Sequence, residues 1–93
     1  MVSGNISPLP QSGRRFRTTT GEFADQGNGR WGESGRNGQQ NVFTVVRQQP
    51  HSIGLFDAQR SLYVRLLTNR AEARPSLASP WRPWPGSEGA WVR

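Results

Sequence analysis

The sequence predicts a mainly β protein, a small antiparallel β-meander closed into a barrel or sandwich. Short apolar segments recur at spacings of about ten residues and are separated by turn-rich segments, a pattern that is typical of such folds. The chain of 93 residues leaves room for one domain only. We therefore expect a single β domain over residues 13–93, preceded by a flexible arm over residues 1–12.

The N-terminal part of the chain is poor in large apolar residues. Residues 1–12 have no periodicity and contain two prolines, which favours an extended arm. Arginines and threonines then alternate around Phe16, which predicts an edge strand that ends at Gly21. Residues 26–41 are rich in glycine and asparagine and are expected to form turns around one short strand, Arg30–Ser34.

The apolar centre of the sequence is residues 42–67, which hold twelve large apolar residues. Its first part, Val42–Arg47, is the clearest predicted strand, because its β-branched and aromatic residues suit a buried face. Pro50 follows and ends this strand, since proline cannot donate to a strand ladder.

The rest of the apolar centre is expected to form a β-hairpin. Alternation over residues 53–67 places Leu62, Val64 and Leu66 on one inward face. A helix over residues 58–74, with an N-capping aspartate and a terminating proline, is the alternative. On that helix, arginines would interrupt the apolar arc, so the hairpin is favoured.

The segment after Pro75 is rich in proline and tryptophan. Prolines interrupt it repeatedly, so we expect no regular structure over residues 76–89. Trp81, Trp84 and Trp91 either cap an undersized core or remain exposed as a docking site. Capping is favoured because a short domain has few other sources of burial.

Two short motifs lie in the middle of the chain. Residues 31–33 have the form W-x-E, and residues 55–60 have the form L-x-D-x-x-R. With the aromatic residues around them, they resemble a small β-barrel or meander module of unassigned function over about residues 21–67. The resemblance implies a β fold and carries no catalytic residues. More distantly, the apolar segments from residue 43 onward resemble one repeat of a β-trefoil, which a homotrimer would complete.

The charge of the chain favours acidic partners such as nucleic acid, an anionic surface or an acidic protein. All twelve basic residues are arginines, the formal net charge is +6 and the pI is about 11.7. Either the base composition of the genome or selection for guanidinium chemistry would explain the arginines. The densest basic cluster is Arg14, Arg15 and Arg17.

Several chemistries have no support in the sequence. The absence of cysteine excludes disulfides, thiol catalysis and cysteine-based zinc sites. His51 is the only histidine and has no nearby partner in sequence for a metal site or a catalytic triad. No stretch approaches the roughly 20 apolar residues of a membrane span, and the N-terminus lacks the features of a signal peptide. We expect no enzymatic activity, no cofactor and no metal, in a soluble protein whose compartment stays open.

These features predict a non-enzymatic binding or assembly module that associates with itself or with a larger complex, through a protein partner or as a homo-oligomer. Nucleic-acid binding by arginines and stacking tryptophans is one alternative. Lectin-like carbohydrate binding around Trp31 and Glu33 is another. The candidate binding surface comprises Arg14, Arg15, Arg17, Trp31, Glu33, Trp81 and Trp84.

Overall fold

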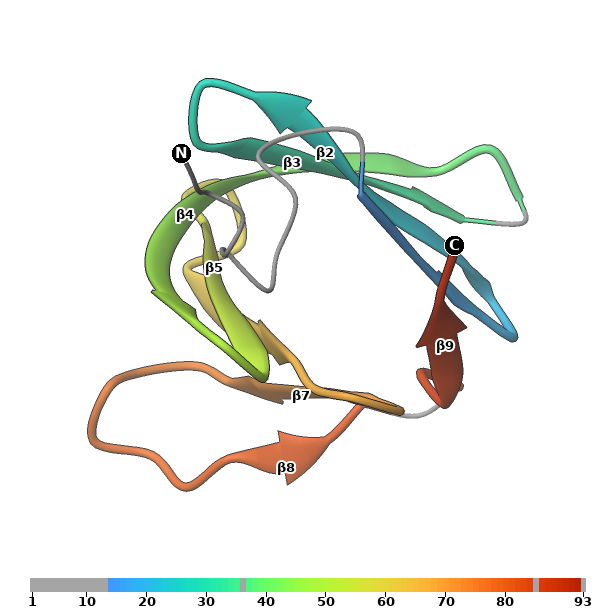
Figure 1. Cartoon of the computed structure of the whole chain (residues 1–93). Coiled ribbons are helices and arrows are strands. Elements are labelled where there is room, and N and C mark those ends of the chain that lie inside the picture. Colours follow the sequence, from blue (N-terminus) through green and yellow to red (C-terminus); the bar gives the residue numbers. More distant parts are fainter. Residues whose placement is uncertain (1–13, 36, 85, 93) are drawn as a thin grey trace, which may run out of the picture.

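The computed structural model describes residues 14–35, 37–84 and 86–92, in which nine antiparallel strands form one curled sheet (Figure 1). The strands are β1 (Arg15–Thr18), β2 (Gly21–Gly27), β3 (Arg30–Gly35), β4 (Gln40–Gln49), β5 (Ser52–Asp57), β6 (Leu62–Leu66), β7 (Ala71–Arg74), β8 (Arg82–Pro83) and β9 (Gly89–Trp91). The expected arm over residues 1–12 lies outside the described residues.

The strands follow one another as a meander. Each strand from β1 to β7 pairs with the next one, and β9 returns to pair with β1, so the sheet order is β8-β7-β6-β5-β4-β3-β2-β1-β9. The sheet curls until β7 lies across the interior from β2 and β3 (Figure 1). The prediction of a mainly β, antiparallel fold is confirmed. None of the described residues belongs to a helix with the length and apolar character needed to cross a membrane.

β5 and β6 form the predicted hairpin. Leu55 lies opposite Val64, and Ile53 lies opposite Leu66. All four side chains are buried, as the alternation of apolar residues requires. The alternative helix over residues 58–74 is therefore wrong.

The sequence pattern predicts neither β2 nor the last three strands. The expected end of a strand at Gly21 is wrong, because the chain turns just before it and Gly21 begins β2. The backbone carbonyl of Ser34 on β3 lies so close to Gly21 that a Cβ there would clash, which explains the glycine. Regular structure also enters residues 76–89, where none is expected, because β8 pairs with β7 and β9 pairs with β1.

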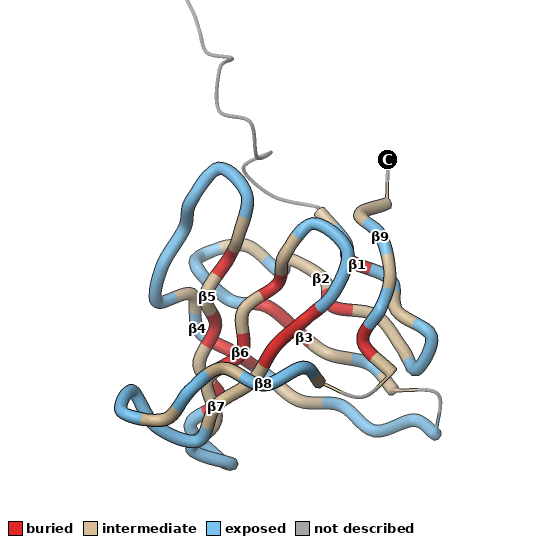
Figure 2. The backbone as a smooth tube through the Cα atoms, turned by 90° about the horizontal axis from the view of Figure 1, so that it is seen from below, coloured by how far each residue is buried: buried red, intermediate tan, exposed pale blue. Residues whose placement is uncertain are grey.

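The core lies on the concave side of the curled sheet. Buried residues recur along the strands that surround the interior (Figure 2). The buried apolar residues are Phe16, Phe23, Trp31, Phe43, Ile53, Leu55, Val64, Leu66 and Ala71. They come from β1 to β7, so each of these strands contributes to one continuous core.

The sheet is not closed by strand pairing, because no ladder joins β8 to β9 among the described residues. Residues 86–91 bridge this gap instead. The hydroxyl of Ser87 donates to the carbonyl of Ala71 at 2.9 Å and accepts from its N–H at 3.1 Å. The N–H of Gly89 donates to the carbonyl of Asn69 at 3.0 Å. The expected closed barrel is thus a curled half-barrel with a bridged gap.

Two of the three C-terminal tryptophans pack against the core. The ring of Trp91 lies edge-on to Phe16 at 5.1 Å and to Trp31 at 6.0 Å, and its Nε1 donates to the carbonyl of Leu67 at 3.1 Å. Trp84 also packs against the buried cluster. These indoles add apolar contact at the bridged gap.

The buried face of the hairpin leads to a first prediction. Val64 is fully buried, so Val64→Ala removes buried apolar surface and leaves a cavity, and should lower the free energy of unfolding by about 1–3 kcal/mol. The matched control is Val42→Ala on β4, whose side chain is 56% exposed and should cost less than about 1 kcal/mol. Urea unfolding followed by tryptophan fluorescence measures both. Equal losses would contradict the inward placement of Val64.

The bridge leads to a second prediction. Ser87→Ala leaves the buried N–H of Ala71 without its acceptor, which should cost about 1–3 kcal/mol of unfolding free energy. Ser79→Ala is the control, because among the described residues the Ser79 hydroxyl bonds only to the hydroxyl of Ser76, in an exposed loop. A shift in unfolding midpoint no larger for the first variant than for the second would show that the bridge does not stabilise the fold.

Candidate functional site

A row of facing residues crosses four neighbouring strands of the sheet. Arg47 on β4 lies opposite Gly54 on β5, and Gly54 lies opposite Arg65 on β6. Arg65 in turn lies opposite Glu72 on β7. Because glycine has no side chain, the row is hollow between the two arginines. A Cβ on Gly54 would lie 3.2 Å from the Cβ of Arg47, so even a methyl group would crowd this position.

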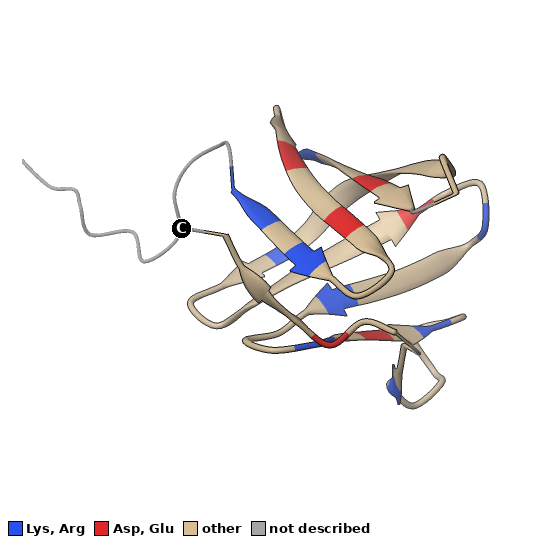
Figure 3. Ribbon diagram, turned by 90° about the vertical axis from the view of Figure 1, so that its right-hand side faces the viewer, with Lys and Arg blue, Asp and Glu red and all other residues tan. Residues whose placement is uncertain are grey.

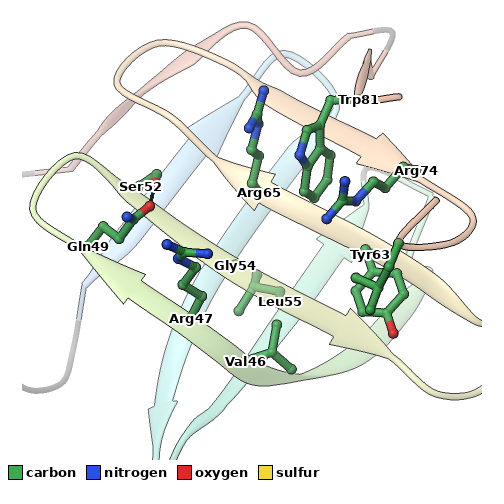
Figure 4. Close-up of a pocket in the computed structure, with 11 residues that line it drawn as sticks. Val46, Arg47, Gln49, Ser52, Gly54, Leu55, Tyr63, Arg65, Arg74 and Trp81 are labelled. Atoms are coloured by element: carbon green, nitrogen blue, oxygen red, sulfur yellow. Dashed lines mark hydrogen bonds between the residues drawn. The ribbon is translucent and has the colours of Figure 1, made fainter. Parts of the chain in front are cut away.

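This hollow, which we call the arginine groove, has a volume of about 430 Å³. Its size lies within the range of small-ligand sites. Figure 4 shows Arg65, Trp81 and Arg74 along one side, Arg47 on the other, and Gly54 between them. The lining residues are Val46, Arg47, Gln49, Ser52, Gly54, Leu55, Tyr63, Arg65, Arg74, Leu77 and Trp81.

Trp81 fixes two of the arginines of the groove. The loop that follows β7 brings its indole over β6 and β7, between two guanidinium groups (Figure 4). The guanidinium carbons of Arg65 and Arg74 lie 4.5 and 4.2 Å from the centre of the ring. Contacts of a cation with an indole face at this distance are attractive, so they hold both side chains in place.

Glu72 is the acidic group beside the groove, and its side chain is only 8% exposed. The Nε of Arg65 donates to Oε1 at 2.7 Å, while Nε and Nη2 of Arg70 donate to Oε2 at 3.1 and 3.0 Å. Burial raises the pKa of a carboxyl group, but here the hydrogen bonds and charges of the two arginines outweigh it and hold the pKa of Glu72 below its usual value. Glu72 therefore stays ionised and anchors Arg65.

The groove carries more positive charge than Glu72 neutralises. Arg47 makes no ion pair with the described residues, and the Nε of Arg74 is buried without a hydrogen-bond partner among them. Two exposed apolar side chains stand beside these charges, Val46 at 55% and Leu77 at 65% exposure. Val46 points outward where a β-bulge shifts the register between β4 and β5. The groove thus suits a ligand that joins a negative group to an apolar one.

None of the three arginines of the basic cluster singled out in the sequence lines the arginine groove, although Arg14 lines a neighbouring hollow together with Ser52. Arg14, Arg15 and Arg17 belong to β1 or precede it, and β2 and β3 separate β1 from β4. Arg15 pairs with Glu22 at 3.3 Å, and the guanidinium of Arg14 lies over the ring of Trp91 at 3.8 Å. Figure 3 shows basic residues at separate places on several strands, not as one continuous band.

The aromatic and acidic residues of the predicted binding surface also lie in different parts of the structure. Only Trp81 lines the arginine groove. Trp31 is 2% exposed, so its indole faces lie within the core and not on a surface. Glu33 and Trp84 line a different hollow at one end of the sheet.

The groove residues that the sequence pattern does not single out are Arg47, Gly54, Arg65 and Arg74. A glycine inside a strand is a signal of close approach or of a hollow, and Gly54 is such a residue. Alternation with buried Val64 also places Arg65 outside. Arg47 and Arg65 lie on either side of Gly54 because of the strand register, which no local sequence pattern reveals.

Comparisons of this chain with protein-family models, with curated proteins and with solved structures found no match. The groove is therefore interpreted from its own residues. In the part of the chain that the structure describes, no group of three or more histidine, cysteine or acidic side chains is placed to hold a metal ion.

The ionised Glu72 leads to a third prediction, on pH. Its pKa is lower in the folded chain than in the unfolded chain, so its stabilising effect is complete above the unfolded pKa and is lost as the pH falls through the folded pKa. Glu72→Gln should therefore destabilise the protein at neutral pH, and the gap to the wild type should shrink in acid. Urea midpoints over a range of pH measure this gap.

Glu22→Gln is the matched control, because the ion pair of Glu22 with Arg15 is more exposed, with side chains 27% and 52% exposed. Its effect should be small at every pH. A gap between wild type and Glu72→Gln that stays constant into acid would contradict the assigned pKa direction.

Proposed function

We propose that this chain is a non-enzymatic binding module that holds an acidic segment of a partner protein in the arginine groove. The observation that carries the proposal is the row in which Gly54 leaves a hollow between Arg47 and Arg65. The hollow lies on the outer face of strands whose inner face forms the core, so the site is built on rigid elements.

The chemistry of the groove supports an acidic segment that also carries apolar side chains. A guanidinium group presents a planar fork of donors that matches a carboxylate with two hydrogen bonds. Arg47 has no acidic partner among the described residues. We therefore expect Arg47 to bind a carboxylate of the ligand. Tyr63, Val46 and Leu77 offer apolar surface within the same groove. Aromatic residues and arginines are the side chains that most often dominate the energy of protein interfaces.

The positions of the other arginines favour a protein segment over nucleic acid. Nucleic-acid binding draws its affinity from many phosphate contacts along one basic surface. Arg15 and Arg17 lie on β1, which β2 and β3 separate from β4 in the strand order, and Arg14 lines a different hollow from the groove. Trp31 is buried and offers no face to a base. The groove offers a short local site, which suits a few side chains better than a polynucleotide backbone.

A peptide screen tests the proposal. The protein is used to select from a library of short random peptides, and we expect enrichment of aspartate or glutamate next to leucine or an aromatic residue. The best peptide is then titrated by calorimetry. Arg47→Ala should weaken its binding about tenfold, because one charge-assisted contact is lost. Gly54→Ala should weaken it as well, because the added methyl group crowds Arg47 and narrows the hollow without removing charge.

Arg17→Ala is the matched control, because Arg17 is an exposed arginine on β1 that forms no ion pair with the described residues. It removes the same charge and should leave the affinity unchanged. Equal losses of peptide affinity in Arg17→Ala and Arg47→Ala would show that the peptide responds to the overall charge of the protein and not to the arginine groove. An oligonucleotide that displaces the peptide and binds more tightly would replace the proposed partner by nucleic acid.

A further inference from the structure

We infer that the chain has a second binding site, for a neutral sugar, in a polar hollow at one end of the curled sheet. The hollow has a volume of about 400 Å³. Its lining residues are Thr20, Glu33, Gly35, Asn37, Gln39, Arg60 and Trp84. None of them lines the arginine groove, so the two sites are independent.

The meander brings these residues to one end of the sheet. In an up-and-down sheet, every second turn lies at the same end. The turns after β1, β3 and β5 hold Thr20, the pair Asn37 and Gln39, and Arg60, respectively. Residues far apart in the sequence therefore meet in one hollow, although no local motif joins them.

A chain of hydrogen bonds holds the polar side chains of the hollow in place. Asp57, with a side chain only 3% exposed, accepts from the backbone N–H groups of Gln59 and Arg60 at 2.9 and 3.2 Å. Its other oxygen accepts from the Nε of Arg60 at 2.5 Å. The Nη2 of Arg60 then donates to Oε1 of Glu33 at 3.1 Å, and Asn41 donates to the same oxygen at 3.1 Å. The orientation of Glu33 and Arg60 is thus set before any ligand arrives.

The polar atoms of the hollow that remain outside this hydrogen-bond chain are of the kinds that bind hydroxyl groups. Both hydrogen bonds of Glu33 go to Oε1, so Oε2 has no partner among the described residues. The side-chain N–H groups of Asn37 and Gln39 add further donors, and the hydroxyl of Thr20, which donates to the carbonyl of Gly86 at 3.3 Å, can still accept. A sugar offers hydroxyl groups that donate and accept at once, which matches this mixture.

The charge of the hollow favours a neutral ligand. Among its described lining residues, the negative charge of Glu33 is balanced by the positive charge of Arg60. Because these two charges balance, the hollow offers no net attraction to an anion or to a cation. The arginine groove, with its excess of positive charge, instead favours an anionic ligand.

Trp84 supplies the apolar surface that a sugar ring needs. Its ring lies edge-on to Phe23 at 5.9 Å and is half-buried, so its position is fixed by the core. The guanidinium carbon of Arg60 lies 5.7 Å from the centre of the same ring. An indole that packs against the C–H face of a pyranose next to fixed polar groups is a suitable sugar site. Trp84 thus takes the place beside Glu33 that the sequence suggests for Trp31.

The experiment is a glycan array probed with the whole protein, followed by a titration of the free glycan that binds best. Backbone amide NMR should show saturable shifts at Asn37, Gln39 and the Trp84 indole. Glu33→Gln replaces the free oxygen by an N–H donor while its other oxygen can still accept from Arg60, so we expect binding about tenfold weaker in a folded protein. Arg47→Ala should leave the glycan affinity unchanged, which separates this site from the arginine groove.

Glu22→Gln on β2 is the matched control and should bind the glycan as the wild type does, because Glu22 does not line the hollow. No binding to any neutral glycan on the array would overturn the inference. So would glycan-induced shifts confined to the arginine groove, or equal affinity for the wild type and Glu33→Gln. In each of these cases the hydrogen-bond chain would serve only to hold the turns at this end of the sheet together.

Discussion

The bridge between residues 86–91 and β7 is the constraint on which the rest of the structure depends. Only 32% of the residues are hydrophobic, so this chain has little apolar surface with which to hold a fold together. A curled sheet of short strands encloses a core only if its two ends are held near each other. The hydroxyl of Ser87 makes two hydrogen bonds to Ala71 on β7, and Trp91 packs on Phe16 of β1. The bridge thereby connects the two ends of the sheet.

The same strand register builds the core and the arginine groove. Side chains alternate between the two faces of a strand, so burying Val64 places Arg65 outside, and burying Leu55 places Gly54 outside. A shift of one residue would move arginines into the core and expose apolar side chains. The apolar pattern therefore holds Arg47 and Arg65 opposite each other across Gly54. The chemistry of the outer face is fixed by the packing of the inner one.

Whether an element can be predicted from the sequence depends on whether a local pattern or a distant partner strand determines it. The hairpin of β5 and β6 is predictable because alternation over adjacent residues is a local signal. β2, β7 and β9 are short or begin at glycine, and they form because a partner strand lies beside them, which is a long-range effect. The sites follow the same division. The sequence draws attention to Trp81, Glu33 and Trp84, but pairing Trp84 with Glu33, or Arg47 with Arg65, requires the order of the strands.

The pairing of β1 with β9 has a consequence for the order of folding. Phe16 lies opposite Trp91, so the first described strand is completed by almost the last described residues. Hairpins such as β5–β6 can form early because they join neighbouring segments, whereas the contact of β1 with β9 joins segments far apart in the sequence and costs more loop-closure entropy. On the ribosome, the β1 edge and the apolar side of Phe16 would stay uncovered until the C-terminal residues emerge. The interval before that moment is when this chain is most exposed to aggregation.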